Sequence, residues 1–307
     1  MPSHQVDLPA ITLPILGPIL GHLPNLSSLI LQNIALQWDP SILAQPYYPS
    51  FTLYALILNN VSTNVICLSD LFSLFSEIQN LALNIRGDLE PVALHPPNHP
   101  LLVQSLSLRV RDTESDVEAI HALVQSSLDV TTIARYSCKV TLGFETVILF
   151  LNSPNLEALT SLCLDLTGMN IDDVASLPWF KLNVLGRPSL KSFHLILLYN
   201  FTESWHSVPD SLQSLPGTFI TDIALHVVGS ASQMGFLTWD SVDHALGSYP
   251  RLRTITIILD LIDRMTLDDE NTFEQVKSKI ERQWVVKRDS LRVLRLEEWQ
   301  RERGYEV

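Results

Sequence analysis

The chain has 307 residues and a formal net charge of −13 at neutral pH, with 46% hydrophobic and only 17% charged residues. This composition excludes an intrinsically disordered protein, because so much apolar side chain offsets the entropy of ordering the chain. The negative charge argues against non-specific binding to nucleic acid, since phosphates repel an acidic surface.

The N-terminal region is apolar, with no Asp, Glu, Lys or Arg from Leu8 to Trp38. A membrane-spanning helix needs about 20 consecutive apolar residues, and prolines at positions 9, 14, 18 and 24 interrupt this run. No basic segment precedes the run, so a secretory signal peptide is not expected either. The segment therefore predicts a buried first repeat and no contact with a membrane.

One short pattern then recurs along the chain: an apolar residue is followed three positions later by a second, and two positions after that by a third. The ten triplets are Leu26/Leu29/Leu31, Leu53/Leu56/Leu58, Ile78/Leu81/Leu83, Val103/Leu106/Leu108, Ile133/Tyr136/Cys138, Leu159/Leu162/Leu164, Leu190/Phe193/Leu195, Ile220/Ile223/Leu225, Leu252/Ile255/Ile257 and Leu291/Leu294/Leu296. Their central residues are 25 to 39 positions apart. Such spacing is typical of leucine-rich repeats, the later copies having longer loops.

Helical patterns lie between the triplets. For example, Ser115 and Glu118 have the spacing of a capping box ahead of apolar residues that share one helix face. A strand followed by a helix, repeated many times, places the strands in parallel and the helices outside them. We therefore predict an α/β solenoid of the leucine-rich-repeat, ribonuclease-inhibitor-like type, with parallel strands on the concave face.

The predicted domain organisation is a single repeat domain over residues 1–307, with about ten repeats between residues 8 and 298. A charged C-terminal cap is expected over residues 259–307, which contain half of the 20 Lys and Arg. The four prolines between Asp88 and Pro100 predict a surface loop. Trp38 and Trp299 follow strands directly, where they could cover the ends of the stack.

Candidate binding residues come from the strand positions that alternate with the buried ones and should line the concave face. The early strands present neutral side chains there, whereas the middle strands present charged and imidazole groups, namely Arg109, Arg135, Lys139, Asp165, His194, Asp222 and His226. Charged groups on an otherwise neutral concave surface predict a protein-binding site that uses charge-assisted hydrogen bonds. The alternative is an ordinary solvated surface.

Motifs for catalysis are absent from the sequence, which has no G-x-G-x-x-G, G-x-x-x-x-G-K-[ST] or G-x-S-x-G. His95 and His99 are four residues apart, but the prolines between them prevent the helix that would aim both at one metal ion. The three cysteines form no C-x-x-C pair and fit reduced thiols in the cytoplasm or nucleus. We expect no enzymatic activity, no cofactor and no metal.

An alternative function remains open from the residues alone. A small-molecule receptor or enzyme would use a deep pocket above the central strands, with His194, His226 and Asp165 converging on it. A decayed paralogue without a partner is the third possibility.

Three segments carry a resemblance to a known family: LPNLSSLILQNIALQWD, LSDLFSLFSEIQNLALNI and LGSYPRLRTITIILD. They resemble the repeat region of fungal F-box proteins, especially those of mushroom-forming fungi, and the likeness covers residues 8 to 298. In that family an F-box docks the chain onto Skp1 of a ubiquitin ligase, and the repeats recognise a substrate.

The resemblance lacks one part of the family pattern, since no F-box precedes Leu8 in this sequence. Docking to Skp1 is therefore not expected from this chain, and only the substrate-recognition half of the family's role is implied. We expect a monomeric, cytoplasmic or nuclear recognition module that binds a protein partner.

Overall fold

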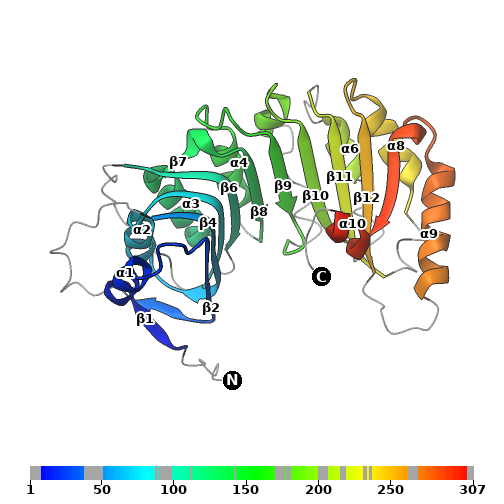
Figure 1. The fold of residues 1–307 in the computed structure, drawn as a ribbon. Coiled ribbons are helices and arrows are strands. Elements are labelled where there is room, and N and C mark those ends of the chain that lie inside the picture. The colour runs from blue at the N-terminus through cyan, green and yellow to red at the C-terminus, as the bar shows by residue number, and fades with distance from the viewer. Residues whose placement is uncertain are drawn as a thin grey trace. The chain divides into compact units, whose positions relative to one another are not determined.

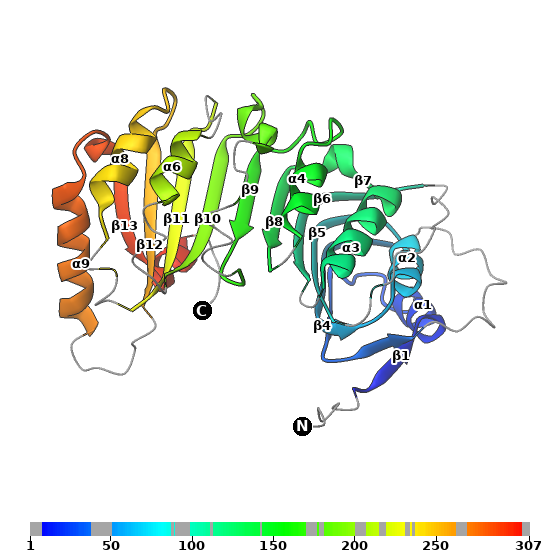
Figure 2. The ribbon, with the colours of Figure 1, turned by 180° about the vertical axis from the view of Figure 1, so that it is seen from behind.

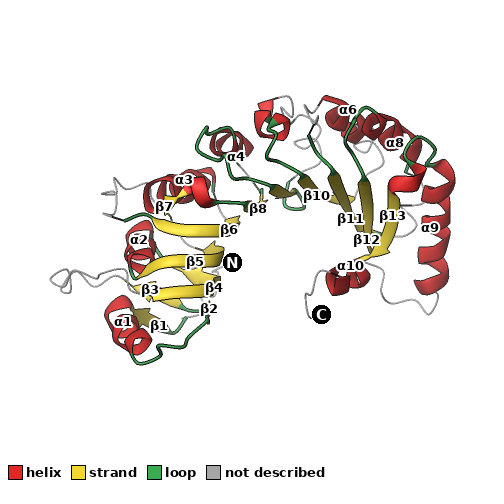
Figure 3. Ribbon diagram, turned by 45° about the horizontal axis from the view of Figure 1, so that its top comes forward, coloured by secondary structure: helices red, strands yellow, loops and turns green. Residues whose placement is uncertain are grey.

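The computed structural model describes residues 8–37, 51–86, 89, 99–110, 113–141, 143–169, 177, 181–199, 207–214, 219–230, 234, 237–261 and 269–302. These residues belong to two compact units, unit 1 (Met1–Ala158) and unit 2 (Leu159–Val307). Both units consist of parallel strands with helices packed on one side (Figure 1), and unit 2 has one further helix, α10 (Leu296–Glu302), on the other side (Figure 3). The prediction of an α/β fold with parallel strands is confirmed, and a single repeat domain stays a prediction.

Unit 1 contains eight of the strands that the structure describes. In chain order its elements are β1 (Ala10–Thr12), α1 (Leu13–Gly21), β2 (Ser28–Gln32), β3 (Ala35–Gln37), β4 (Phe51–Ser62), α2 (Val65–Ser73), β5 (Phe75–Arg86), β6 (Leu101–Val110), α3 (Glu114–Ser127), β7 (Leu128–Asp129), a 3-10 helix (Val130–Thr132), β8 (Arg135–Lys139) and α4 (Phe144–Leu151). The main order of pairing is β2-β4-β5-β6-β8, with β3 also pairing with β4 and β1 with β3.

Unit 2 contains five described strands. Its elements are β9 (Ser161–Asp165), a 3-10 helix (Asn183–Gly186), β10 (Ser192–Tyr199), α6 (Ser207–Ser214), β11 (Asp222–Gly229), α8 (Trp239–Gly247), β12 (Thr254–Leu261), α9 (Asp269–Gln283), a 3-10 helix (Arg288–Ser290), β13 (Leu291–Arg295) and α10 (Leu296–Glu302). The strands pair in parallel in the order in which they occur in the chain.

The apolar triplets are aligned across neighbouring strands. In unit 1 Leu56 lies opposite Leu29 and Leu81, and the same register continues to Leu106 and Tyr136. In unit 2 it runs from Leu162 through Phe193 and Ile223 to Ile255. Because side chains on a strand alternate between faces, this alignment puts every second residue into one core. Nine of the ten predicted triplets are therefore in register within their units.

The tenth triplet is wrong. Ile255 and Ile257 lie opposite Leu291 and Val293, not opposite Leu294 and Leu296. The strand ends at Arg295, and Leu296 is the first residue of α10. Three leucines fit the repeat pattern there. In the structure Leu291, Val293 and Arg295 alternate onto the helix side of the strand, and Val293 is buried. Arg295 consequently lies on the helix side, with its guanidinium carbon 4.5 Å from the centroid of the Phe273 ring.

With the exception of α10, the helices cover one face of each sheet, as the reverse view shows (Figure 2). We call the opposite face of each sheet the inner face. Apolar residues of the helices, including Leu68 on α2, Ile120 on α3 and Val242 on α8, are fully buried against the triplets. Burying a side chain of this size stabilises the fold by about 1.5–3 kcal/mol.

The helix after β6 begins two residues earlier than the sequence indicated. Thr113 is extended and forms the capping box with Asp116, whereas Ser115 lies inside the first turn. The Asp116 carboxylate also accepts a hydrogen bond from the Leu89 backbone N–H at 2.7 Å. This second bond fixes the position of the capping residue and has no local signature in the sequence.

A buried polar pair supports the fifth triplet, where Tyr136 takes the place of a leucine. The His121 Nδ1 lies 2.7 Å from the Val117 carbonyl oxygen, and its Nε2 lies 2.9 Å from the Tyr136 hydroxyl. A carbonyl only accepts, so Nδ1 carries the proton and the Tyr136 O–H donates to Nε2. Burial lowers the pKa of His121 and raises that of Tyr136, and both effects favour this neutral arrangement.

Several predicted features lie outside the described residues. They are most of the loop from Asp88 to Pro100, including His95, together with Trp38 and two parts of the predicted cap, residues 262–268 and 303–307.

Candidate partner-binding site

The inner face of unit 1 is a regular grid of fifteen positions on five strands. The positions pair in register and are Ser28, Ile30 and Gln32 on β2; Ala55, Ile57 and Asn59 on β4; Asn80, Ala82 and Asn84 on β5; Ser105, Ser107 and Arg109 on β6; and Arg135, Ser137 and Lys139 on β8. All except Ala55 are exposed or half-buried. We call this surface the unit 1 grid.

Three predicted binding residues come together on the unit 1 grid. Arg109 lies directly opposite Lys139, and Arg135 lies on the same strand as Lys139 with one inward-facing position between them. Arg109 and Arg135 are exposed, and Lys139 is half-buried. The fifteen positions contain these three cations and no carboxylate. The arrangement can therefore donate charge-assisted hydrogen bonds to acidic groups of a bound molecule.

Side-chain amides form the neutral part of this face. The Asn84 Nδ2 donates to the Asn59 Oδ1 at 2.8 Å, and the Asn80 Nδ2 donates to the Tyr54 carbonyl at 3.2 Å. The asparagines at positions 33 and 60 adopt positive φ angles of 53° and 56° and hydrogen-bond to each other. Asparagine tolerates this conformation better than most residues, which explains why these two follow the first two triplets at matching offsets.

In unit 2 the two predicted carboxylates bind their own chain. The Asp165 Oδ1 accepts hydrogen bonds from the Thr167 N–H at 2.9 Å and from its hydroxyl at 2.6 Å. The Asp222 Oδ2 accepts from the Thr221 hydroxyl at 2.6 Å. These local bonds stabilise turns at the ends of strands. A binding role for either carboxylate stays a prediction.

The two predicted histidines lie together. The rings of His194 on β10 and His226 on β11 are stacked, with centroids 6.0 Å apart and an interplanar angle of 18°. The Cys163 Sγ lies 3.6 Å from the His194 Nδ1. The His226 Nε2 lies 3.8 Å from the Asp260 Oδ2. Sequence reasoning placed both histidines on the open face, but His226 is only 7% exposed.

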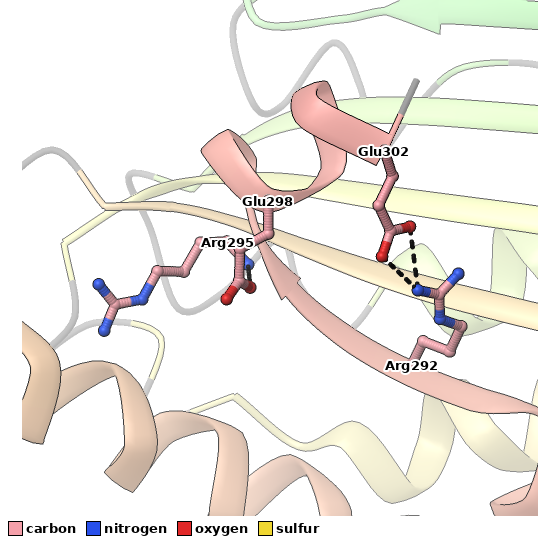
Figure 4. A network of polar contacts seen from close by, with 4 residues as sticks. All are labelled: Arg292, Arg295, Glu298 and Glu302. Carbon is pink, nitrogen blue, oxygen red and sulfur yellow. Dashed lines mark hydrogen bonds and ion pairs between the residues drawn. The ribbon is translucent and has the colours of Figure 1, made fainter. Parts of the chain in front are cut away.

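The helix α10 lies over the inner face of unit 2 and packs against β12 and β13. Figure 3 shows α10 on the inner side of the strands, opposite α6, α8 and α9. The Trp299 ring lies 5.2 Å from that of His194, centroid to centroid. The Arg292 Nη2 is 2.7 Å and 2.9 Å from the two carboxylate oxygens of Glu302 (Figure 4). Trp299 thus covers the inner face, not the end of the stack.

A pocket that the structure shows in unit 2 lies away from the predicted histidines. A cavity of about 510 Å³ lies on the helix side of unit 2, lined by residues of α6 and α8 and by Gln283, Val285 and Val286. His194, His226 and Asp165 do not line it. Within the described ranges, no three His, Cys, Asp or Glu side chains are grouped so as to hold a metal ion.

No protein-family model matches the chain, and no curated protein matches it at a significant level. Among the helices in the part of the chain that the structure describes, none has the length and apolar character needed to cross a membrane. The functional assignment therefore depends on the geometry of the two inner faces and on the chemistry of their side chains.

The main feature that sequence reasoning missed is the docking of α10. Leu296 and Trp299 are three residues apart, which is the spacing of one helix face. This spacing is the sequence signal for the helix. Leu296 also fits the L-x-x-L-x-L pattern as the last residue of the tenth triplet, and that match concealed the helical spacing. Ile258 and Thr256 lie on the inner face of β12, against which this helix packs, and both are buried.

Proposed function

We propose that this protein is a non-enzymatic protein-recognition module of the leucine-rich-repeat, ribonuclease-inhibitor-like type. The unit 1 grid binds an acidic segment of a protein partner. The observation that supports this most directly is the unit 1 grid itself, where fourteen of fifteen in-register positions are exposed or half-buried and the only charges are three cations.

The chemistry of the grid fits such a segment. Arg109, Arg135 and Lys139 donate to carboxylates, and Arg does so with a planar fork that matches two oxygens. The neighbouring amides on β4 and β5 both donate and accept hydrogen bonds, so they match the backbone of a bound segment. Because the whole chain carries a net charge of −13, a local positive surface selects the site at which an acidic partner docks.

The resemblance to fungal F-box proteins extends this proposal. In that setting the chain is the substrate-binding part of an F-box-type ubiquitin-ligase adaptor, acting as a monomer in the cytoplasm or nucleus. The partner is then a protein that the ligase modifies.

The test is selection of random peptides displayed on phage against the immobilised full chain. The wild-type chain should enrich peptides rich in Asp and Glu, and Arg135→Glu/Lys139→Glu should lose them. The double variant should keep its free energy of unfolding within about 1 kcal/mol of the wild type, since Arg135 is exposed, Lys139 is half-buried, and substitutions on the surface rarely cost more.

A matched control is Arg282→Glu/Arg288→Glu, which makes the same change in net charge at two exposed positions of unit 2. This control should enrich the same acidic peptides as the wild type. Equal enrichment by Arg135→Glu/Lys139→Glu would refute the assignment of the unit 1 grid.

A further inference from the structure

The two inner faces differ in how much of their surface is buried. In unit 1 the inner-face residue Ile30 is 59% exposed. In unit 2 the inner-face residue Ile258 is 0% exposed and its neighbour Thr256 is 9% exposed, so β12 is buried on both sides. Because α10 lies over this part of the sheet (Figure 3), unit 2 has an inner-face site that a helix already occupies.

The floor of that site has three kinds of group. Ile258 and Leu294 pair in register and form an apolar patch. The stacked rings of His194 and His226 form an aromatic platform beside it. Arg292, in register with Thr256, supplies a cation. A short helix can contact all three groups if it carries an apolar aromatic residue and a carboxylate on one face.

The helix α10 meets these requirements from a partly exposed position. Trp299 lies against His194, and Glu302, three residues later and thus on the same helix face, pairs with Arg292 (Figure 4). Among its described residues none is fully buried, and Arg292 and Glu302 are each about half exposed. A seven-residue helix is not stable on its own, and an ion pair this exposed contributes little. The sheet therefore holds α10 in a shallow and replaceable way.

We propose that the inner face of unit 2 is a docking surface for a short helical segment of a protein partner. That segment carries an aromatic residue and, three positions later, a carboxylate. The helix α10 is the internal occupant, which the partner segment displaces. This inference depends on the proposed recognition role and specifies the partner chemistry for the second inner face.

Displacement is a competition within one chain. Because α10 follows β13 without a linker, its effective concentration at the inner face of unit 2 is on the order of millimolar or higher. A free segment of equal quality binds weakly while α10 is intact. Weakening the contacts of α10 should therefore raise the affinity for a segment added from outside.

The test uses the full chain and a fluorescent peptide with the sequence of α10, LEEWQRE, in a fluorescence anisotropy titration. We expect Trp299→Ala to bind the peptide at least about tenfold more tightly than the wild type, because aromatic anchors dominate such contacts. Adding His194→Ala should reverse that gain. A peptide with Ala in place of Trp should bind neither protein, and Leu149→Ala, an exposed change on α4, should match the wild type.

Two results would overturn the proposal. The first is equal affinity of the wild type and Trp299→Ala for the peptide. The second is no peptide binding to any variant, including Glu302→Gln, which weakens the docking of α10 more mildly. Thermal unfolding of each variant verifies that it is folded. If gel filtration shows that Trp299→Ala forms a dimer whose fraction rises with protein concentration, the occupant is a second copy of the chain. That result would also refute the proposal of a separate partner.

The experiment is separable from the test of the unit 1 grid. Arg135→Glu/Lys139→Glu should leave the peptide affinity of the Trp299→Ala chain unchanged, since those residues belong to unit 1. Loss of acidic-peptide selection by unit 1 and loss of helix docking by unit 2 are thus distinct outcomes.

Discussion

Removing the Asp243 carboxylate should destabilise unit 2 substantially. Asp243 lies on α8 and is 1% exposed. Its two oxygens accept hydrogen bonds from the backbone N–H groups of Val285, Val286 and Lys287, at donor–acceptor distances of 2.6, 2.5 and 3.0 Å. One side chain thus satisfies three successive donors and holds the segment after α9 against α8.

The magnitude follows from these bonds. A hydrogen bond to a charged group contributes about 1.5–3 kcal/mol, so three independent ones would give about 4.5–9 kcal/mol. The donors share one acceptor and are not additive, and Val285 and Val286 are 74% and 55% exposed, so water replaces part of the loss. We expect Asp243→Ala to lower the free energy of unfolding by about 2–4 kcal/mol. Asp243→Asn should cost about half of that, because one acceptor oxygen remains.

The assay is urea denaturation followed by circular dichroism, supported by thermal melts in which Tm should fall by roughly 5–15 °C. The matched control is Asp240→Ala, which removes an exposed carboxylate from the first turn of the same helix. This control should change stability by less than about 1 kcal/mol. A loss for Asp243→Ala no larger than that for Asp240→Ala would refute the reasoning.

Two further predictions concern unit 1. Burial lowers the pKa of His121 below its ordinary value of 6.5; the unfolded chain therefore binds more protons as the pH falls through 6.5, and stability should be full above that pH and decrease below it. His121→Gln should flatten this pH dependence in denaturation curves recorded between pH 5 and 8, and an unchanged slope would contradict the buried, neutral His121–Tyr136 pair. Gly143 has a φ of 66°, and an added Cβ would lie 3.3 Å from the Cβ of Val117, so Gly143→Ala should cost about 1–3 kcal/mol. Gly21→Ala, with no neighbour within 4 Å of the added atom, is the control and should not destabilise; equal effects of the two would exclude strain at Gly143.

The sequence pattern predicted the strands well because the repeat is a local signal. Leu56, Leu81 and Leu106 occupy matching positions 25 residues apart, and parallel pairing follows once each strand buries the same two positions. Even Tyr136, a poor match to the pattern, occupies its predicted place. Its hydroxyl is satisfied by His121, so a larger polar side chain fits where leucine is usual.

The failures share one physical cause, which is contact between residues distant in sequence. The capping residue of α3 depends on the bond between Asp116 and Leu89, and no pattern within the helix encodes it. The helix α10, which packs on the inner face near the stacked histidines, begins at Leu296, 70 residues after His226. The candidate residues were placed correctly on alternating strand positions, yet the covering of one face could not be deduced from alternation.

The most direct measurement is disulfide formation between neighbouring inner-face positions. Ser107 on β6 lies opposite Ser137 on β8, so Ser107→Cys/Ser137→Cys in a Cys163→Ser background should oxidise readily, since paired strands are about 4.8 Å apart. Ser105→Cys/Ser137→Cys is two residues out of register, about 8 Å apart, and should stay reduced. Rapid oxidation of the mismatched pair, or none of the matched pair, would contradict the register on which the unit 1 grid depends.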